Sequence, residues 1–268
     1  MTKKTNGGKM RALTAEQIQD NYKQLLNTVQ LYITGDRKDK VLKMYNELED
    51  RISIAPASAK EHYHNAMIGG YIDHILRVVD LSLKIKELWE QNSGKVDFTD
   101  EELVFSALHH DLGKVGDLEH DYYIPQDNEW RRKNMGEIFT FNPKCEYMSV
   151  TDRAFFLLQH YNISISQKEF IGIRLTDGMY EEANKSYYVA YKTEFQLRSV
   201  IQYVLHQADM MAAQIENRLT KDSIEKDETE VYERIQNIQQ AVGNKEKIKD
   251  ENPKITKDLF EELFGEKK

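Results

Sequence analysis

The segment Thr99–Lys114 reads TDEELVFSALHHDLGK. Thr99 followed by Glu102 is a capping box, in which each residue satisfies a backbone N–H of the other, so it predicts that a helix begins here. The apolar residues of this helix recur at helical spacing as Leu103, Val104, Ala107, Leu108 and Leu112. Two polar residues, His110 and Asp111, fall on or beside the same apolar side. The segment therefore predicts a core helix that ends in a candidate site.

The same helical spacing recurs along most of the chain and predicts a mainly α fold. Only four prolines and thirteen glycines interrupt the pattern. The predicted helices cover residues 14–29, 41–48, 62–89, 99–112, 150–158, 166–175 and 194–219, with weaker patterns at 231–242 and 259–264. Further capping boxes, Thr14 with Gln17 and Ser166 with Glu169, mark two of their starts. One β-hairpin is expected, with residues 122–124 and 138–141 flanking a polar tip at 126–133.

These patterns divide the chain into four parts. Residues 1–12 are polar, carry paired glycines and predict a disordered tail, and residues 13–54 form N-terminal helices. The main domain covers residues 55–219 and contains a non-helical insert at about 116–145. Residues 220–268 are strongly charged and predict a helical appendage that forms a solvated surface or an oligomer contact. A homo-oligomer therefore stays open.

Composition limits the classes of function. Among 268 residues, 45 Asp and Glu outnumber 37 Lys and Arg, for a net charge of −8. That balance argues against broad nucleic-acid binding, which depends on clustered cations. The single cysteine, Cys145, excludes a disulfide framework and fits a reducing compartment. There is no apolar run of roughly 20 residues and no apolar segment behind the basic N-terminus, so we expect a cytoplasmic protein without membrane contact.

Ionisable residues stand on the apolar sides of three predicted helices. They are His74, the pair His110-Asp111, and Asp209. An unpaired buried carboxylate costs several kcal/mol, so each aspartate needs a cation or a metal. Alone, such a histidine is more often a satisfied core residue, and such an aspartate more often a cap or an ion-pair partner. Together, neutral imidazoles and carboxylates are the ligands that one divalent metal prefers, which favours a metal site.

This arrangement resembles the H…HD…D pattern of HD-domain metal-dependent phosphohydrolases. His74 supplies the first histidine, His110-Asp111 the central pair and Asp209 the last aspartate. The blocks that extend the resemblance are Ala55–Ser58, His64, Gly69-Gly70, Asp73-His74, His109–Lys114 and Gln207–Met211. They are similar to a bacterial and phage HD subgroup and to the HD domain of 3′–5′ exoribonucleases, over residues 52–217. The resemblance implies a helical HD domain whose four ligands hold a metal.

One position departs from the subgroup's pattern. Thr176 stands where the subgroup tends to carry a histidine, two residues after Arg174. His160, one predicted helix earlier, is the residue that could partly compensate. Without the extra histidine we expect one metal ion rather than two: Mn²⁺, Fe²⁺, Co²⁺, Ni²⁺ or Zn²⁺, with Mg²⁺ also allowed.

The resemblance implies a metal-activated water that attacks a phosphoryl group. Asp111 would also orient the water, and Asp117 is a candidate for proton transfer. Lys114 and Arg77 are candidate phosphate ligands, against the alternative of ordinary surface or ion-pairing cations. The remaining candidate substrate contacts are His64, Arg131, Arg174 and Tyr123, and the candidate supports behind the ligands are Asp73, His160 and Thr176. For the insert, which carries Tyr123 and Arg131, a plain solvated turn is an equal alternative.

The function that we expect is hydrolysis of a phosphate ester of a nucleotide, by a nucleotidase or a nucleoside triphosphate hydrolase. The net charge of −8 favours a small phosphorylated substrate over a long nucleic acid. One alternative is an HD-type phosphodiesterase or 3′–5′ exonuclease acting on single strands. Another is a non-catalytic HD-fold protein that binds nucleotides or regulates a partner, a reading that the intact ligand set disfavours.

Overall fold

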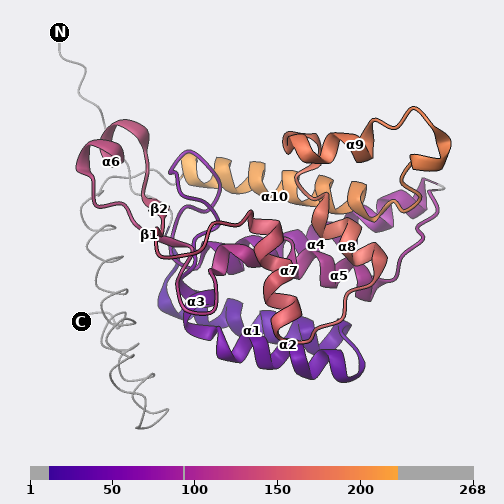
Figure 1. The fold of residues 1–268 in the computed structure, drawn as a ribbon. Helices are drawn as coiled ribbons and strands as arrows, with labels where there is room; N and C mark the ends of the chain where they lie inside the picture. The colour runs from indigo at the N-terminus through magenta and orange to yellow at the C-terminus, as the bar shows by residue number, and fades with distance from the viewer. Residues whose placement is uncertain (1–11, 93, 223–268) are drawn as a thin grey trace.

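The computed structural model describes residues 12–92 and 94–222 and shows a mainly helical protein, as predicted (Figure 1). The predicted tail up to residue 11 and the appendage from residue 223 lie outside these residues. None of the described helices has the length and apolarity needed to cross a membrane. The elements are α1 (Ala15–Tyr32), α2 (Gly35–Glu47), α3 (Glu49–Ile54), α4 (Gly70–Gln91), α5 (Asp100–His109), η1 (Leu112–Val115), β1 (Tyr123–Pro125), α6 (Glu129–Met135), β2 (Phe139–Phe141), α7 (Val150–His160), α8 (Gln167–Arg174), η2 (Gly178–Tyr180), η3 (Glu182–Asn184), α9 (Lys185–Tyr188), η4 (Thr193–Phe195) and α10 (Ile201–Asp222).

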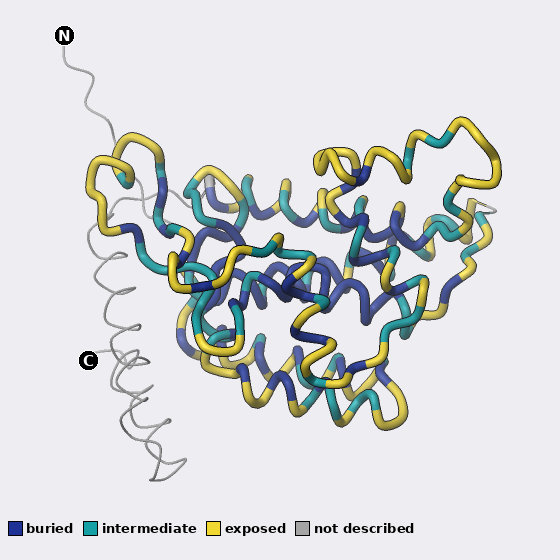
Figure 2. The backbone as a smooth tube through the Cα atoms, viewed as in Figure 1, coloured by how far each residue is buried: buried dark blue, intermediate teal, exposed yellow. Residues whose placement is uncertain are grey.

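Helix α4 forms the centre of the molecule. It packs along α10 on one side and against α5 and α1 on others. In Figure 2 the deeply buried backbone runs through α4, α5 and the inner side of α10. Fully buried side chains such as Ile75, Leu108 and Val204 join these helices into one core. Each such side chain stabilises the fold by roughly 2 kcal/mol relative to an exposed position.

The capping boxes fix three helix starts as predicted. Thr14, Thr99 and Ser166 each accept a hydrogen bond from the backbone N–H three residues on. The glutamine or glutamate at that position bonds back to the backbone of the capping residue. At each start the N–H of the capping residue and the N–H three residues on are thus satisfied, which sets where α1, α5 and α8 begin.

Two helices begin later than the sequence predicts. The helix expected from residue 62 starts at Gly70, because Asn65 and Gly69 adopt positive φ angles of 43° and 73° and turn the chain. A Cβ at Gly70 would stand 2.1 Å from the carbonyl oxygen of Asn65, so only glycine permits this close turn. The helix expected from residue 194 starts at Ile201. The N–H of Val200, the residue before it, donates a hydrogen bond to the carboxylate of Asp97 (3.0 Å).

The predicted hairpin forms, but its tip is more structured than expected. Strands β1 and β2 pair antiparallel, with Tyr123 opposite Phe141 and Pro125 opposite Phe139. Between them, the polar segment predicted as a tip includes the short helix α6. Asn128 caps the start of this helix, because its side-chain oxygen accepts a hydrogen bond from the N–H of Arg131 (3.1 Å). Local capping therefore makes a helix where alternation alone indicates a turn.

A buried polar relay links α5 to α2. Tyr45 O–H donates to His109 Nε2 (3.1 Å), since His109 Nδ1–H donates to the carbonyl of Phe105 (2.7 Å). Both side chains are fully buried. Burial lowers the pKa of His109 from 6.5 to about 3, which keeps the ring neutral.

This relay predicts acid sensitivity of the fold. Between pH 6.5 and 3, His109 is protonated in the unfolded chain but stays neutral in the folded chain. Stability therefore falls as the pH is lowered, by up to about 1.4 kcal/mol per pH unit from this residue. A His109→Gln variant should show a shallower fall of the unfolding free energy between pH 7 and pH 5 in denaturant titrations. Parallel curves for both proteins would contradict the assignment.

Candidate metal centre

The four residues predicted as ligands come together at the junction of α4, α5 and α10. His74 Nε2 lies 3.1 Å from Asp209 Oδ1 and 3.7 Å from Asp111 Oδ2. His110 Nε2 lies 3.6 Å from Asp111 Oδ2 and 3.8 Å from Asp209 Oδ1. One ligand atom from each of His74, His110 and Asp209 fits within 4.8 Å of the others. The spacing suits a single ion between them.

Local structure explains how these side chains meet. Helix α4 carries His74 against α10, which carries Asp209. Helix α5 ends at His109, and Asp111 adopts φ −106° and ψ 9° before the chain continues into η1. Gly113 in η1 lies so close to α7 that a Cβ there would be 2.0 Å from the carbonyl oxygen of Val150. The end of α5 is thereby held in one position relative to the core.

The hydrogen bonds of both imidazoles are made at Nδ1, which leaves Nε2 to face the carboxylates of the cluster. His110 Nδ1 lies 2.8 Å from the carbonyl oxygen of Ala107, and a carbonyl only accepts, so Nδ1 carries the hydrogen. His74 Nδ1 likewise pairs with a carboxylate oxygen of Glu216 at 3.0 Å. The Nε2 atoms of both rings are buried and have no hydrogen-bond partner among the described residues. Such orphaned nitrogens are costly unless a metal takes them.

His64 brings a third imidazole to the cluster. It lies on the loop between α3 and α4, and its ring centroid is 4.7 Å from that of His74. Its Nε2 is also buried without a hydrogen-bond partner. With His74 and Asp111 it forms a second group of the right spacing for a metal. Burial lowers the pKa of His64 to about 2, so the ring is neutral and able to ligate.

Charge balance offers a rival explanation of the cluster. Although burial opposes protonation, Glu216 and Asp209 raise the pKa of His74 to about 10. Burial would raise the pKa of Asp111, but Lys114, His110 and His74 lower it below its ordinary value. A protonated His74 could therefore satisfy the carboxylates. It would still leave the Nε2 atoms of His64 and His110 orphaned, and this favours a metal ion over a proton.

Glu216 belongs to the buried cluster and was missed by the sequence analysis. It is fully buried, and its carboxylate bonds His74 Nδ1 at 3.0 Å and Arg77 Nε at 3.0 Å. It lies two turns after Asp209 on α10, and this spacing was a signal that it shares a helix face with the ligand. A carboxylate behind a ligand histidine fixes the tautomer and raises the basicity of the ring.

Replacing Glu216 should weaken metal binding without removing a ligand. A Glu216→Gln variant keeps the size of the side chain but loses the charge that faces His74. We expect about a 10- to 100-fold higher dissociation constant for Mn²⁺ or Zn²⁺, measured by competition with a chelator. The matched control is Glu90→Gln, which removes an exposed carboxylate of α4. Equal affinity in both variants would contradict a role for Glu216 behind His74.

Three further candidates lie beside the ligands. Lys114 Nζ bonds Asp111 Oδ2 at 2.5 Å and is mostly buried, so it adds a positive charge next to the carboxylates. Arg77 donates hydrogen bonds to the carboxylates of Glu216 on α10 and Asp73 on α4, so its guanidinium links these two helices. Asp73 also accepts from Asn65 Nδ2 (2.8 Å), which ties the loop carrying His64 to α4.

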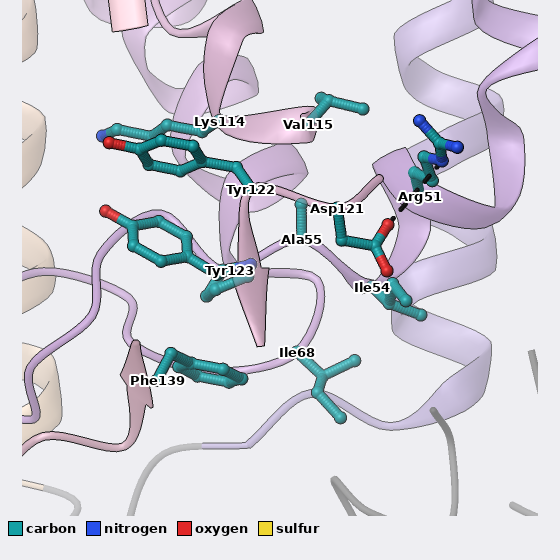
Figure 3. A pocket seen from close by; sticks show the side chains of 11 residues that line it. Arg51, Ile54, Ala55, Ile68, Lys114, Val115, Asp121, Tyr122, Tyr123 and Phe139 are labelled. Carbon is teal, nitrogen blue, oxygen red and sulfur yellow. Dashed lines mark ion pairs between the residues drawn. The ribbon is translucent and has the colours of Figure 1, made fainter. Parts of the chain in front are cut away.

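Tyr123 lines a small pocket next to Lys114. Figure 3 shows both side chains at this pocket, together with Tyr122 and Phe139. The cavity is about 10 Å³, room for about one water molecule. Burial raises the pKa of Tyr123 to about 12, although the charge of Lys114 opposes this. The phenol is therefore a hydrogen-bonding group beside the cation, and a base or sugar would not fit this pocket as it stands.

Other predicted site residues are engaged elsewhere. Asp117 Oδ1 accepts from the N–H groups of Glu119 and His120, so it shapes a turn. Arg131 pairs with Glu137 (2.8 Å) in the insert, and Arg174 donates to Asn184 (2.6 Å). Neither contact involves the ligands.

The two residues weighed as replacements also point elsewhere. His160 is exposed at the end of α7 and packs against Tyr161, with ring centroids 5.1 Å apart. Thr176, just past the end of α8, is buried, and its hydroxyl donates to the carbonyl of Gly172 (2.8 Å) in that helix. Among the described residues, His64 is therefore the extra imidazole at the cluster, rather than His160.

Comparisons with known proteins assign no family. No family model matches the chain, and no curated protein or solved structure matches it significantly. What the molecule offers is the cluster itself: two overlapping groups, His64, His74 and Asp111, and His74, His110 and Asp209, each at the right spacing for a metal ion, with Lys114 beside them.

Proposed function

We propose that the protein is an HD-type, metal-dependent phosphohydrolase that hydrolyses a phosphate ester of a nucleotide. The observation that carries the proposal is the convergence of two buried Nε2 atoms, of His74 and His110, on Asp111 and Asp209. Neither nitrogen makes a hydrogen bond with a described residue. This donor set suits Mn²⁺, Fe²⁺, Co²⁺, Ni²⁺ or Zn²⁺. The resemblance to HD-domain proteins adds the reaction class.

A bound divalent ion would lower the pKa of a water molecule and neutralise charge on the phosphate oxygens. The chain's own residues would bind the ion, orient its ligands and bind the phosphate. His74, His110, Asp111 and Asp209 would hold the ion, and the buried Glu216 bonds Nδ1 of His74 and so orients its ring. Asp111 can also accept a hydrogen bond from the attacking water, since its carboxylate is not fully enclosed. Lys114 Nζ stands beside it to bind a phosphate oxygen.

A small substrate is favoured by charge. The chain carries a net charge of −8, and carboxylates dominate the cluster, so the metal and Lys114 must supply the attraction for phosphate. A long polyanion would need a basic path as well. A nucleotide needs only the site.

The test is a substrate screen with Mn²⁺-loaded protein. Nucleoside mono-, di- and triphosphates are compared with single-stranded oligonucleotides, and phosphate release and chain shortening are both recorded. The proposal expects phosphate release from at least one nucleotide class. Stepwise shortening of oligonucleotides without nucleotide hydrolysis would instead support the exonuclease alternative. Metal binding without hydrolysis of any substrate would support a non-catalytic binding protein.

A further inference from the structure

His64 lies among the candidate ligands, although the four-ligand site proposed above does not include it. One of its ring nitrogens lies within 4.8 Å of ligand atoms of His74 and Asp111. Two nitrogens that bind the same Zn²⁺ ion are at most about 4.2 Å apart, which is twice a Zn–N bond. Only a small shift would therefore bring His64 into contact with an ion that His74 holds.

The ring of His64 needs a partner inside the cluster. Its Nε2 is buried and makes no hydrogen bond with a described residue, and its ring centroid lies 4.7 Å from that of His74. A buried polar atom without a partner costs about 1–3 kcal/mol. A phosphate contact would leave this nitrogen unsatisfied whenever the substrate is absent. A resident metal ion would satisfy it throughout.

Hydrogen bonds on both sides of His64 hold it in place. Ser58 Oγ donates to the carbonyl oxygen of His64 (2.6 Å), and the N–H of Ala57 donates to the carbonyl oxygen of Asn65 (3.1 Å). Asn65 Nδ2 donates to Asp73 Oδ2 (2.8 Å), which ties the loop to α4 one residue before His74. The imidazole is thus positioned before an ion binds, and such preorganisation lowers the entropic cost of binding.

The two possible metal-binding groups overlap in a way that favours one ion. His74 belongs to both groups. Its Nδ1 faces Glu216, and Nε2 has a single lone pair, so His74 binds one ion at a time. A second ion would have to share Asp111, but Lys114 Nζ lies 2.5 Å from Asp111 Oδ2 and would repel it. The groups are therefore two parts of the same site.

We propose that His64 is a fifth protein ligand of the metal ion, so that three imidazoles and two carboxylates surround it. This assignment rests on the metal site proposed above and restricts which ion it holds. Imidazole ligands suit Fe²⁺, Ni²⁺ and Zn²⁺, whereas Mg²⁺ and Mn²⁺ prefer oxygen. Five protein ligands on an octahedral ion leave one position, which a water molecule can take. Binding of phosphate then depends on Lys114.

Proton NMR of the Co²⁺-loaded protein without substrate counts the histidine ligands. A bound paramagnetic ion strongly shifts the ring signals of each imidazole that ligates it, and Co²⁺ lies between Fe²⁺ and Ni²⁺ in affinity order. The wild type should show three shifted rings at one Co²⁺ per chain, and His64→Ala should show two. The matched control is His62→Ala, which removes an exposed imidazole of the same loop and should keep three.

Competition with a chelator gives a second readout, on variants whose fold is checked by circular dichroism. His64→Ala should raise the dissociation constant of Zn²⁺ by about 100-fold or more, because groups that only orient a ligand are already worth about 10- to 100-fold. The effect on Mn²⁺ should be smaller. Asn65→Gly keeps the positive φ of 43° accessible and removes the bond to Asp73. It should weaken Zn²⁺ binding by about tenfold or less and retain three shifted rings.

The outcomes separate this assignment from the proposed function. Two shifted rings in the wild type, with unchanged Zn²⁺ affinity in His64→Ala, would contradict the fifth ligand and leave the proposed function standing. Two Co²⁺ ions per chain, of which His64→Ala loses one, would also contradict it, since His64 would then bind an ion of its own. A wild type that binds neither Co²⁺ nor Zn²⁺ contradicts the proposed function, and the assignment with it.

Discussion

An Asp209→Ala variant should lose its metal ion and its activity together. Asp209 Oδ1 lies 3.1 Å from His74 Nε2, and α10 supplies it, whereas His74 comes from α4 and the pair His110-Asp111 follows α5. Without it the cluster loses the one predicted ligand that α10 supplies. We expect kcat/KM to fall on the order of 1000-fold or more, because the ion supplies most of the stabilisation of charge at the phosphate. Metal content and phosphate release are measured on the same preparation.

The control for this prediction is Asp80→Ala. Asp80 is an exposed aspartate of α4 whose carboxylate pairs with Lys84 at 2.7 Å on the surface. Its loss should leave metal content and activity within about twofold of the wild type, as expected for an exposed ion pair. Full metal content in Asp209→Ala would remove Asp209 from the ligand set.

Gly113→Ala should cause a large loss of stability for the addition of a single methyl group. The new Cβ would lie 2.0 Å from the carbonyl oxygen of Val150, and this contact is with backbone, which cannot rotate away. η1 and α7 must therefore separate. We expect a loss of about 3 kcal/mol, at the upper end of overpacking effects. That lowers the melting temperature by about 6–12 °C in a chain of this size.

The same substitution should also reduce activity, since Gly113 stands between Asp111 and Lys114. Gly136→Ala is the control that distinguishes a loss of stability by close packing from a loss by backbone strain. Gly136 has a φ of +60°, but its Cβ would meet no atom closer than 3.4 Å, so it reports backbone strain alone, about 1–2 kcal/mol. If both variants melt at the same temperature, the close packing of η1 on α7 does not contribute to stability.

Much of the fold followed from local sequence patterns. The capping boxes at Thr14, Thr99 and Ser166 each mark a real helix start, because capping involves only residues that are three apart. The apolar periodicity of α4 and α10 also identified the faces on which His74 and Asp209 lie. The helix predicted to residue 112 ends at His109, so His110 and Asp111 follow the end of α5 instead of lying on its face. The four residues meet because α4 packs on both α10 and α5.

Tertiary contacts decide where three residues lie that local patterns placed differently or missed, among them His64, which was expected as a substrate contact. His64 reaches the cluster because Asn65 and Gly69 turn the chain with positive φ angles, which apolar periodicity does not encode. Glu216 is buried by pairing with His74 and Arg77 from another helix. Asp117 was read as a proton-transfer residue from its place near the pair His110-Asp111, but its carboxylate caps a turn. Side-chain direction in loops depends on such contacts.

The most direct test of the account is the metal content of the protein, measured by elemental analysis after purification without chelators. The account predicts about one transition-metal ion per chain, lost in an Asp111→Ala variant that remains folded by circular dichroism. A wild-type protein that holds no metal after supplementation with Mn²⁺, Fe²⁺, Co²⁺, Ni²⁺ or Zn²⁺ would contradict it. The cluster would then be an ion-paired network around a protonated His74.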